Sequence, residues 1–175
     1  MPRISVEPVT RFSGNDLHEL CEAAEDGINA GGGFGWLKPP RRHVMEAYWR
    51  GVLMVPERQL FLGRLDGVVA GSAQLLKATR NNEAQSHAAT LTTNFVAPWA
   101  RGHGLARLLT RTVEAAARDA GLKVLNLDVR ETQEAAIALY ESFGYERCGY
   151  HPYYAMVEGR LVAGIFYTKR LDGAG

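Results

Sequence analysis

The sequence predicts a single α/β domain built on a mixed sheet, and three observations support this prediction. The chain has 175 residues, close to the size of one domain. Hydrophobic residues make up 46% and charged residues 22%, which is typical of a globular chain that buries a core. Strand-like and helical patterns follow one another in the order β-α-α-β-β-β-α-β-α-β-β, without a repeat or a linker. We therefore expect residues 1–175 to form one domain.

The first half of the chain is expected to form a strand, two helices and a hairpin. Residues 3–9 alternate loosely and predict a strand. Residues 13–16 offer helix-capping side chains, and apolar residues at helical spacing predict a helix over 16–29. The glycines of residues 31–35 end this helix, and a second helix is expected over 41–54. Strands are expected over 59–65 and 68–77, because Asp66-Gly67 between them is a strong two-residue turn signal.

The second half continues with alternating strands and helices. Residues 79–86 are polar and predict a loop, and the β-branched residues of 88–96 predict a strand. Helices are expected over 105–120 and 134–143, closed by Gly121 and Gly144, with a short buried strand over 124–129 between them. Terminal strands are expected over 145–150 and 161–169, joined through Glu158-Gly159.

Composition excludes several classes of protein. The formal net charge of +1 lacks the basic excess of a dedicated nucleic-acid binder. No apolar run reaches the roughly 18–20 residues of a membrane span, and the N-terminus does not resemble a signal peptide, so a cytoplasmic location is expected. Cys21 and Cys148 do not suggest a disulfide framework, and the histidines lack metal-ligand spacing, so no metal is expected.

Residues 96–106 carry the most informative pattern, in which a strand runs into a glycine-containing turn that opens a helix. The first amides of a helix have no partners within it and lie at the positive end of the helix dipole, so they suit a phosphate. Arg101 adds positive charge. The alternative is a loop–helix turn that simply needs two glycines. The Walker loop and the dinucleotide fingerprint fit worse, because Gly-Lys-Ser/Thr is missing and Arg107 stands where the fingerprint has its third small residue.

At this point the chain resembles a known family. Arg101-x-x-Gly104-x-Ala106 matches the R/Q-x-x-G-x-G/A motif of the GNAT superfamily of N-acetyltransferases, and residues 136–145 resemble that family's A-x-x-L-Y-x-x-x-G-F signature. The resemblance covers nearly the whole chain. It implies the GNAT fold, a mixed and mostly antiparallel sheet of about seven strands that splays between strands four and five, flanked by about four helices.

The resemblance also implies acetyl-CoA as the acetyl donor. The pantetheine arm would enter the splay and bond to the exposed backbone of Asn94, Phe95 and Val96. The pyrophosphate would lie against the turn and the helix start. The residues expected there are Arg101, Gly102, His103, Gly104, Leu105 and Ala106. Gln133 occupies a cofactor-contact position where the family commonly has Asn.

Two residues are candidates for the catalytic roles. Tyr140 matches the position at which family members often place a general acid for the departing thiolate, although its helical spacing also fits a core residue. Many members carry a general-base Glu on strand four, where this chain has threonines. Asp128 is then the best carboxylate for the task, and its alternative is a strand-end residue that caps the next turn. Glu131 and a chain of waters are further options.

A narrower resemblance concerns the acceptor side. Residues 149–156 look like the tail of tabtoxin-resistance acetyltransferases, and residues 33–37 resemble the loop that closes over the acceptor in that group. This predicts Phe34, Trp36 and Tyr153 as substrate-binding residues. The same aromatic residues could be ordinary packing or a dimer contact, which leaves a homodimer open.

Together these patterns predict an N-acetyltransferase that moves acetyl from acetyl-CoA to a primary amine of a small molecule by direct attack on the thioester. The small molecule could be a toxin, an antibiotic or an amino-acid-like compound. Two alternatives remain at this level: a non-catalytic acyl-CoA sensor, and an acetyltransferase that acts on a protein amine. No nucleic-acid or membrane partner is expected.

Overall fold

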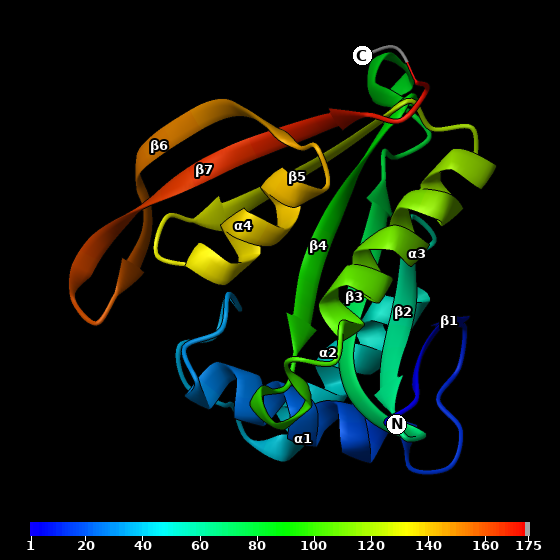
Figure 1. Ribbon diagram of the computed structural model, residues 1–175, viewed down its shortest axis with the longest axis vertical. Helices are drawn as coiled ribbons and strands as arrows, with labels where there is room; N and C mark the ends of the chain where they lie inside the picture. Colours follow the sequence, from blue (N-terminus) through cyan, green and yellow to red (C-terminus); the bar gives the residue numbers. More distant parts are fainter. Residues whose placement is uncertain (174–175) are drawn as a thin grey trace.

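A seven-stranded mixed sheet organises the chain, with the strand order β1-β2-β3-β4-β5-β7-β6 (Figure 1). The computed structural model describes residues 1–173. The strands are β1 (Ile4–Val9), β2 (Arg58–Leu65), β3 (Val68–Lys77), β4 (Ala88–Val96), β5 (Val124–Arg130), β6 (Glu146–Val157) and β7 (Arg160–Arg170). β4 and β5 pair in parallel, and the other neighbouring strands pair antiparallel. The predicted α/β class, the order of elements along the chain and the mixed, mostly antiparallel sheet of about seven strands are therefore confirmed.

Helices cover both faces of this sheet. They are α1 (Asp16–Asn29), α2 (Arg42–Met54), α3 (Leu105–Asp119) and α4 (Glu134–Ser142), with short 3₁₀ turns at Glu83–Gln85 and Pro98–Ala100. Most bounds lie within one or two residues of the predicted ones. The last hairpin differs most, because β6 runs on to Val157 where the sequence predicted a strand that ends at 150. Within residues 1–173, none of the helices is both long and apolar enough to cross a membrane.

Two hydrophobic cores lie on opposite faces of the sheet. Strand alternation separates them, since Phe61 packs with α3 whereas its neighbours Leu60 and Leu62 pack with α1 and α2. The core beside α3 also holds residues of β5, β7 and α4, including Tyr140, together with Tyr145 from the turn after α4. The core beside α1 and α2 is centred on fully buried Trp49 and Met45. Each predicted amphipathic helix thus buries its apolar face against the sheet.

The start of α1 differs from the sequence interpretation. Asn15 is the N-cap residue but makes no side-chain capping bond. Instead, Asp16 Oδ2 accepts a hydrogen bond from the backbone N–H of Ser13 (3.2 Å), and Asp16 Oδ1 accepts one from Arg64 Nη1 (2.9 Å). The carboxylate therefore ties the helix start to β2 rather than capping the helix from outside.

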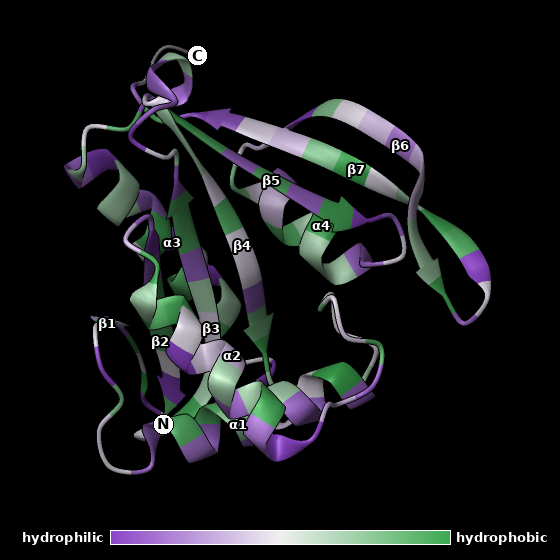
Figure 2. Cartoon of the chain, turned by 180° about the vertical axis from the view of Figure 1, so that it is seen from behind, coloured by the Kyte–Doolittle hydropathy of each residue, from purple (hydrophilic) through white to green (hydrophobic). Residues whose placement is uncertain are grey.

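The sheet opens between β4 and β5, as the family resemblance implied. Their ladder covers Ala88–Thr90 and Val124–Asn126, and the strands then diverge. From this point β5, β6, β7 and α4 lean away from the rest of the sheet, and the β6–β7 hairpin projects from it with hydrophilic and hydrophobic residues interleaved (Figure 2). The divergence leaves an opening in the middle of the molecule.

Candidate active site

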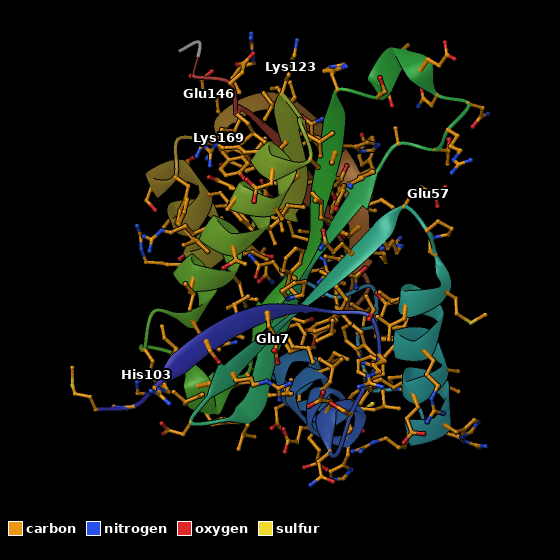
Figure 3. The ribbon with its side chains drawn as sticks, turned by 90° about the vertical axis from the view of Figure 1, so that its right-hand side faces the viewer. Glu7, Glu57, His103, Lys123, Glu146 and Lys169 are labelled. Carbon is orange, nitrogen blue, oxygen red and sulfur yellow. The ribbon has the colours of Figure 1, made fainter. Side chains whose placement is uncertain are left out.

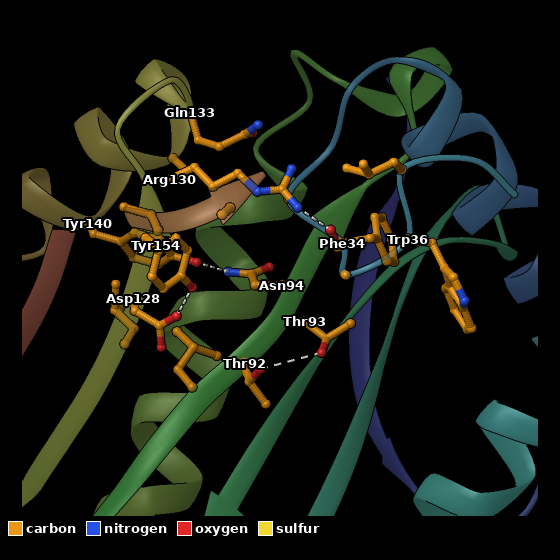
Figure 4. Close-up of a pocket in the computed structure, with 18 of the residues that line it drawn as sticks. Phe34, Trp36, Thr92, Thr93, Asn94, Asp128, Arg130, Gln133, Tyr140 and Tyr154 are labelled. Carbon is orange, nitrogen blue, oxygen red and sulfur yellow. Dashed lines mark hydrogen bonds between the residues drawn. The ribbon is translucent and has the colours of Figure 1, made fainter. Parts of the chain in front are cut away.

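The opening between β4 and β5 is a cleft of about 900 Å³, within the usual size range of small-molecule and cofactor pockets. One wall comes from β4, the other from β5, the start of α4 and β6, and the segment between α1 and α2 covers one end (Figure 4). The polar and aromatic side chains that line it are Phe34, Trp36, Tyr48, Thr92, Thr93, Asn94, Asp128, Arg130, Gln133, Tyr140 and Tyr154. The cleft brings together residues from five separate parts of the sequence.

A β-bulge in β4 sets which side chains enter the cleft. Thr92 pairs with Gln74 and Phe95 pairs with Ser72, so β4 has one more residue than β3 across this interval. Thr93 takes up the extra length with a φ of 49°, a left-handed conformation that is uncommon for a threonine. An inserted residue exchanges the two faces of a strand. Asn94 consequently faces α3 and α4, whereas Phe95 packs on the other face against Phe34, with ring centroids 4.7 Å apart.

Tyr140 lies on α4 with its ring in the core and its hydroxyl group at the cleft wall. The residue is 5% exposed, and its ring packs edge-on against Tyr145 with centroids 5.6 Å apart. Asn94 Nδ2 donates a hydrogen bond to Tyr140 Oη over 3.1 Å. Burial raises the pKa of Tyr140 to about 12, because a buried phenolate would lose its hydration. Tyr140 therefore carries a proton at neutral pH, with its ring in the core and its hydroxyl at the cleft wall.

Asp128 lies on β5, on the same wall as Tyr140, and forms a pair with Tyr154. The hydroxyl of Tyr154 donates to Asp128 Oδ2 (Figure 4). Burial and the neighbouring carboxylate raise the pKa of Tyr154, so the phenol remains protonated and serves as the donor. Asp128 itself is exposed to the cleft. The carboxylate can thus accept a further hydrogen bond from a molecule bound in the cleft.

The β6 strand places Tyr154 in the cleft and Tyr153 outside it. Three residues of β6 lie between the pairs His151–Gly164 and Ala155–Val162, opposite a single residue of β7. This irregularity turns Tyr154 inward, where its ring lies against Gly164 so closely that any Cβ at that position would overlap it. Tyr153 is 69% exposed and does not line the cleft. The sequence pointed to Tyr153, whereas the aromatic side chain of β6 that lines the cleft is that of Tyr154.

The segment between α1 and α2 (residues 30–41, the covering segment) is held across the cleft by side chains from the end of β5 and the start of α4. Arg130 Nη2 donates to the backbone oxygen of Phe34 over 2.5 Å, and Gln133 Nε2 donates to the backbone oxygen of Gly31 over 2.9 Å. Phe34 is buried. Trp36 is half-buried at the cleft edge and packs edge-on against Tyr48, with ring centroids 5.1 Å apart. Gln133, expected to contact a cofactor, lines the cleft and bonds the covering segment.

The predicted phosphate site lies at the start of α3. Gly102 and Gly104 have φ angles of 84° and 83°, which favour glycine, and Gly104 is the N-cap without a side-chain capping bond. Arg101, Gly102 and His103 are exposed, and His103 lies at the molecular surface near β1 (Figure 3). Leu105 is buried under the helix start. The backbone amides of the first turn therefore face solvent without helical partners.

The chain's own residues fit acetyl-CoA as a donor. From Leu91 to Val96, the side of β4 that faces β5 has no ladder partner in the described part of the chain, so its backbone groups can bond an extended arm. The α3 start offers amides to a pyrophosphate. Sequence reasoning missed Tyr154 and Arg130. Arg130 follows Asp128 by two residues on a strand, a spacing that places both side chains on one face and was available as a signal.

Comparison with known proteins gives one family. Residues 18–145 match the model of the acetyltransferase (GNAT) family. The chain is 67% identical over 133 residues, 76% of its length, to an uncharacterized N-acetyltransferase in the hisH-hisA intergenic region of Azospirillum brasilense, covering 79% of that protein.

Solved structures show the same fold at low sequence identity. An N-acetyltransferase from Staphylococcus aureus superposes with a TM-score of 0.81 at 20% identity, covering 97% of this chain and 99% of that one. A phosphinothricin acetyltransferase from Sinorhizobium meliloti, solved in complex with acetyl-CoA, superposes with a TM-score of 0.77 at 18% identity, covering 95% of this chain and 88% of that one.

Proposed function

The chain belongs to the acetyltransferase (GNAT) family, an acetyl-CoA-dependent group of N-acetyltransferases, and from this premise we propose that it acetylates a primary amine of a small molecule. The observation that carries the proposal is the cleft, whose wall of β5 and α4 carries both a buried protonated phenol and an exposed carboxylate. The segment held over it by Arg130 and Gln133 narrows one end, which favours a small acceptor over a folded protein surface. The alternative of a non-catalytic acyl-CoA sensor is set aside, since the family is one of acyltransferases.

The donor would be held by backbone groups. When bound, acetyl-CoA supplies the thioester acetyl group that is transferred. The amides of residues 102–106 would hold the pyrophosphate, and the free side of β4 at residues 94–96 would bond the pantetheine arm. An N–H of β4 near Val96 would polarise the thioester carbonyl and stabilise the negative charge that develops on its oxygen.

Asp128 would act on the acceptor. A free primary ammonium has a pKa of about 10.4 and is not nucleophilic until it loses a proton. The exposed carboxylate of Asp128 would attract the ammonium and accept its proton directly or through water. Tyr154, bonded to Asp128 Oδ2, would hold the carboxylate in place and leave its other oxygen for the amine.

Tyr140 would act on the leaving group. Its hydroxyl lies on the same wall as Asp128, and the phenol is protonated throughout the neutral range because of its burial. Tyr140 would give this proton to the sulfur as the C–S bond breaks. Among the described residues, neither Cys21, which is buried, nor Cys148 lines the cleft, so the proposal has the amine attack directly.

The narrower resemblance to tabtoxin-resistance acetyltransferases stays within this proposal. It rests on the aromatic residues near the acceptor end, of which Trp36 and Tyr154 line the cleft. A toxin, antibiotic or amino-acid-like amine would each meet an aromatic edge beside a carboxylate. The test measures release of free CoA from acetyl-CoA with a panel of such amines and, in parallel, with peptides that offer an N-terminal or a lysine amine. Turnover on the peptides alone would overturn the small-molecule assignment.

The mechanism is tested by Tyr140→Phe, which keeps the ring and removes the hydroxyl. The single-turnover rate of acetyl transfer should fall by roughly 10²–10⁴-fold, the range for loss of a general acid. Tyr145→Phe is the matched control, since Tyr145 packs against Tyr140 in the same core but does not line the cleft. If a well-folded Tyr140→Phe protein transfers acetyl as fast as the Tyr145→Phe control, Tyr140 has no part in the chemistry.

A further inference from the structure

We propose that Asn94 is a positioning residue for Tyr140, because its side-chain amide donates to the phenolic oxygen and so leaves the phenolic proton directed into the cleft. The inference rests on the proposed role of Tyr140 as the acid. It assigns the side chain of Asn94 a task that is separate from the backbone contact expected of this residue. It also explains why the acid of this cleft needs a polar residue on β4.

The direction of the hydrogen bonds around Asn94 follows from the single hydroxyl proton of Thr110. Thr110 Oγ1 donates to the backbone oxygen of Ala106, one helical turn earlier, over 2.9 Å. A hydroxyl has one proton, so towards Asn94 the same oxygen can only accept. The group of Asn94 that faces Thr110 at 3.2 Å must then be the amide nitrogen Nδ2.

The second proton of the same nitrogen reaches Tyr140. Asn94 Nδ2 lies 3.1 Å from Tyr140 Oη and donates to it. Since the phenolic oxygen accepts this bond, its own proton is not used by Asn94 and can be donated elsewhere. Asn94 Oδ1 is buried without a partner among residues 1–173, a cost that indicates that the amide is retained for its donors. A chain of bonds from the α3 backbone through Thr110 and Asn94 therefore orients the hydroxyl of Tyr140.

The same bond stabilises the anion that Tyr140 becomes. Burial raises the pKa of Tyr140, and the hydrogen bond from Asn94 acts in the opposite direction by favouring the phenolate. As the C–S bond breaks, its electron pair stays on sulfur, and sulfur takes the proton of Tyr140 Oη. The phenolate then recovers one of the two protons that the acceptor ammonium loses, and the other passes to solvent. Asn94 thus acts through Tyr140 and need not touch the reacting atoms.

The β4 bulge is what gives Asn94 this position. Without the extra residue at Thr93, the side chain of Asn94 would lie on the face of the sheet that Phe95 now occupies. Phe95 on that face packs with Phe34 and Trp49. One irregularity therefore serves both the core beneath the covering segment and the orientation of the acid.

Asn94→Asp is the decisive variant, because it keeps the shape and replaces the donor with an acceptor. Tyr140 would then donate its proton to the carboxylate, and the negative charge would disfavour the phenolate. We expect the single-turnover rate to fall on the order of 10²-fold, with acetyl-CoA affinity kept. In the Tyr140→Phe background the same change should slow the reaction no further, since the two residues act as one unit. Asn126→Asp on β5 is the matched control, because Asn126 also bonds a threonine but lies outside the cleft.

A second readout uses the free protein. Fluorotyrosine is incorporated, the fluorine resonance of Tyr140 is identified by its loss in Tyr140→Phe, and its phenol is titrated by NMR. The midpoint should move to higher pH in Asn94→Asp and stay in place in Asn126→Asp. Thr110→Val, which removes the anchoring hydroxyl, should move it in the same direction by less and serves if Asn94→Asp does not fold.

The outcomes separate the two proposals. If Tyr140→Phe does not slow transfer, the acid role fails and this inference fails with it. If Tyr140→Phe slows transfer but Asn94→Asp changes neither the rate nor the titration of Tyr140, the acid role stands and Asn94 is only a packing residue. Additive slowing in the double variant would likewise overturn the positioning role.

Discussion

Substitution of Gly104 by Asp tests where the donor's phosphates bind. Gly104 is the N-cap of α3 with a φ of 83°, and a Cβ there would meet only Ile4 Cδ1, at 3.9 Å. The added side chain therefore crowds nothing, and its conformational cost is about 1 kcal/mol, less for Asp and Asn than for other residues. The variant should fold, so its effect on binding can be measured.

The expected loss of affinity follows from Coulomb's law. At about 5 Å, one carboxylate charge opposes each phosphate charge by about 0.8 kcal/mol in water and about 3 kcal/mol at an effective dielectric constant of about 20. Against two phosphate charges the smallest effect is about 1.6 kcal/mol, which is slightly more than tenfold in the dissociation constant. We therefore expect Gly104→Asp to weaken acetyl-CoA binding at least about tenfold.

Calorimetric titration of acetyl-CoA measures this loss, with Gly104→Asn as the control. Asn has the same shape and tolerates the left-handed backbone, but it has no charge. The difference between the two variants should shrink as salt is raised, because ions screen exposed charges. Equal affinities for the Asp and Asn variants at low salt would refute the assignment of the pyrophosphate to this helix start.

Two further predictions concern the acceptor and the stability of the fold. Trp36→Ala should raise the KM for the amine about tenfold, which corresponds to a lost aromatic contact of roughly 1.4 kcal/mol. Acetyl-CoA affinity should stay unchanged, because Trp36 lies at the covered end of the cleft. A higher KM for acetyl-CoA alone, measured by steady-state kinetics, would contradict this. Burial acts to raise the pKa of Asp16, but hydrogen bonds from Arg64 and Ser13 outweigh it and hold that pKa below its usual value. A depressed folded-state pKa stabilises the fold above the ordinary carboxyl pKa and loses this effect as pH falls through the folded value. Asp16→Asn should therefore lower the free energy of unfolding by about 1–3 kcal/mol at pH 7. The difference in this free energy between variant and parent should close below about pH 4. Denaturant unfolding at both pH values measures it, and a difference that persists in acid would contradict the role of the charge.

Local patterns were enough to place most elements of this chain. The strand at Ala88–Val96 and the helix at Leu105–Asp119 were expected within a residue of their bounds, because β-branched runs and helical spacing are properties of one segment. The glycine turn before α3 was also visible, since Gly102 and Gly104 adopt the conformation that glycine favours. The α/β class followed from the order of these elements.

Side-chain direction at the site depended on pairing between strands. A bulge is defined by the register of two strands, so no pattern within β4 alone shows that Thr93 is inserted and that Asn94 turns towards Tyr140. The same reason explains Tyr154, which enters the cleft because β6 carries extra residues opposite β7, whereas the sequence pointed to Tyr153.

Contacts across the cleft were likewise decided by the tertiary structure. Gln133 and Gly31 are about one hundred residues apart in sequence, and so are Arg130 and Phe34. Residue types predicted which chemistry this chain carries, namely a phenol, a carboxylate and a glycine-rich helix start. The splay of β4 from β5 decided which of these groups line the cleft, because that geometry depends on how distant segments pack and not on any one of them.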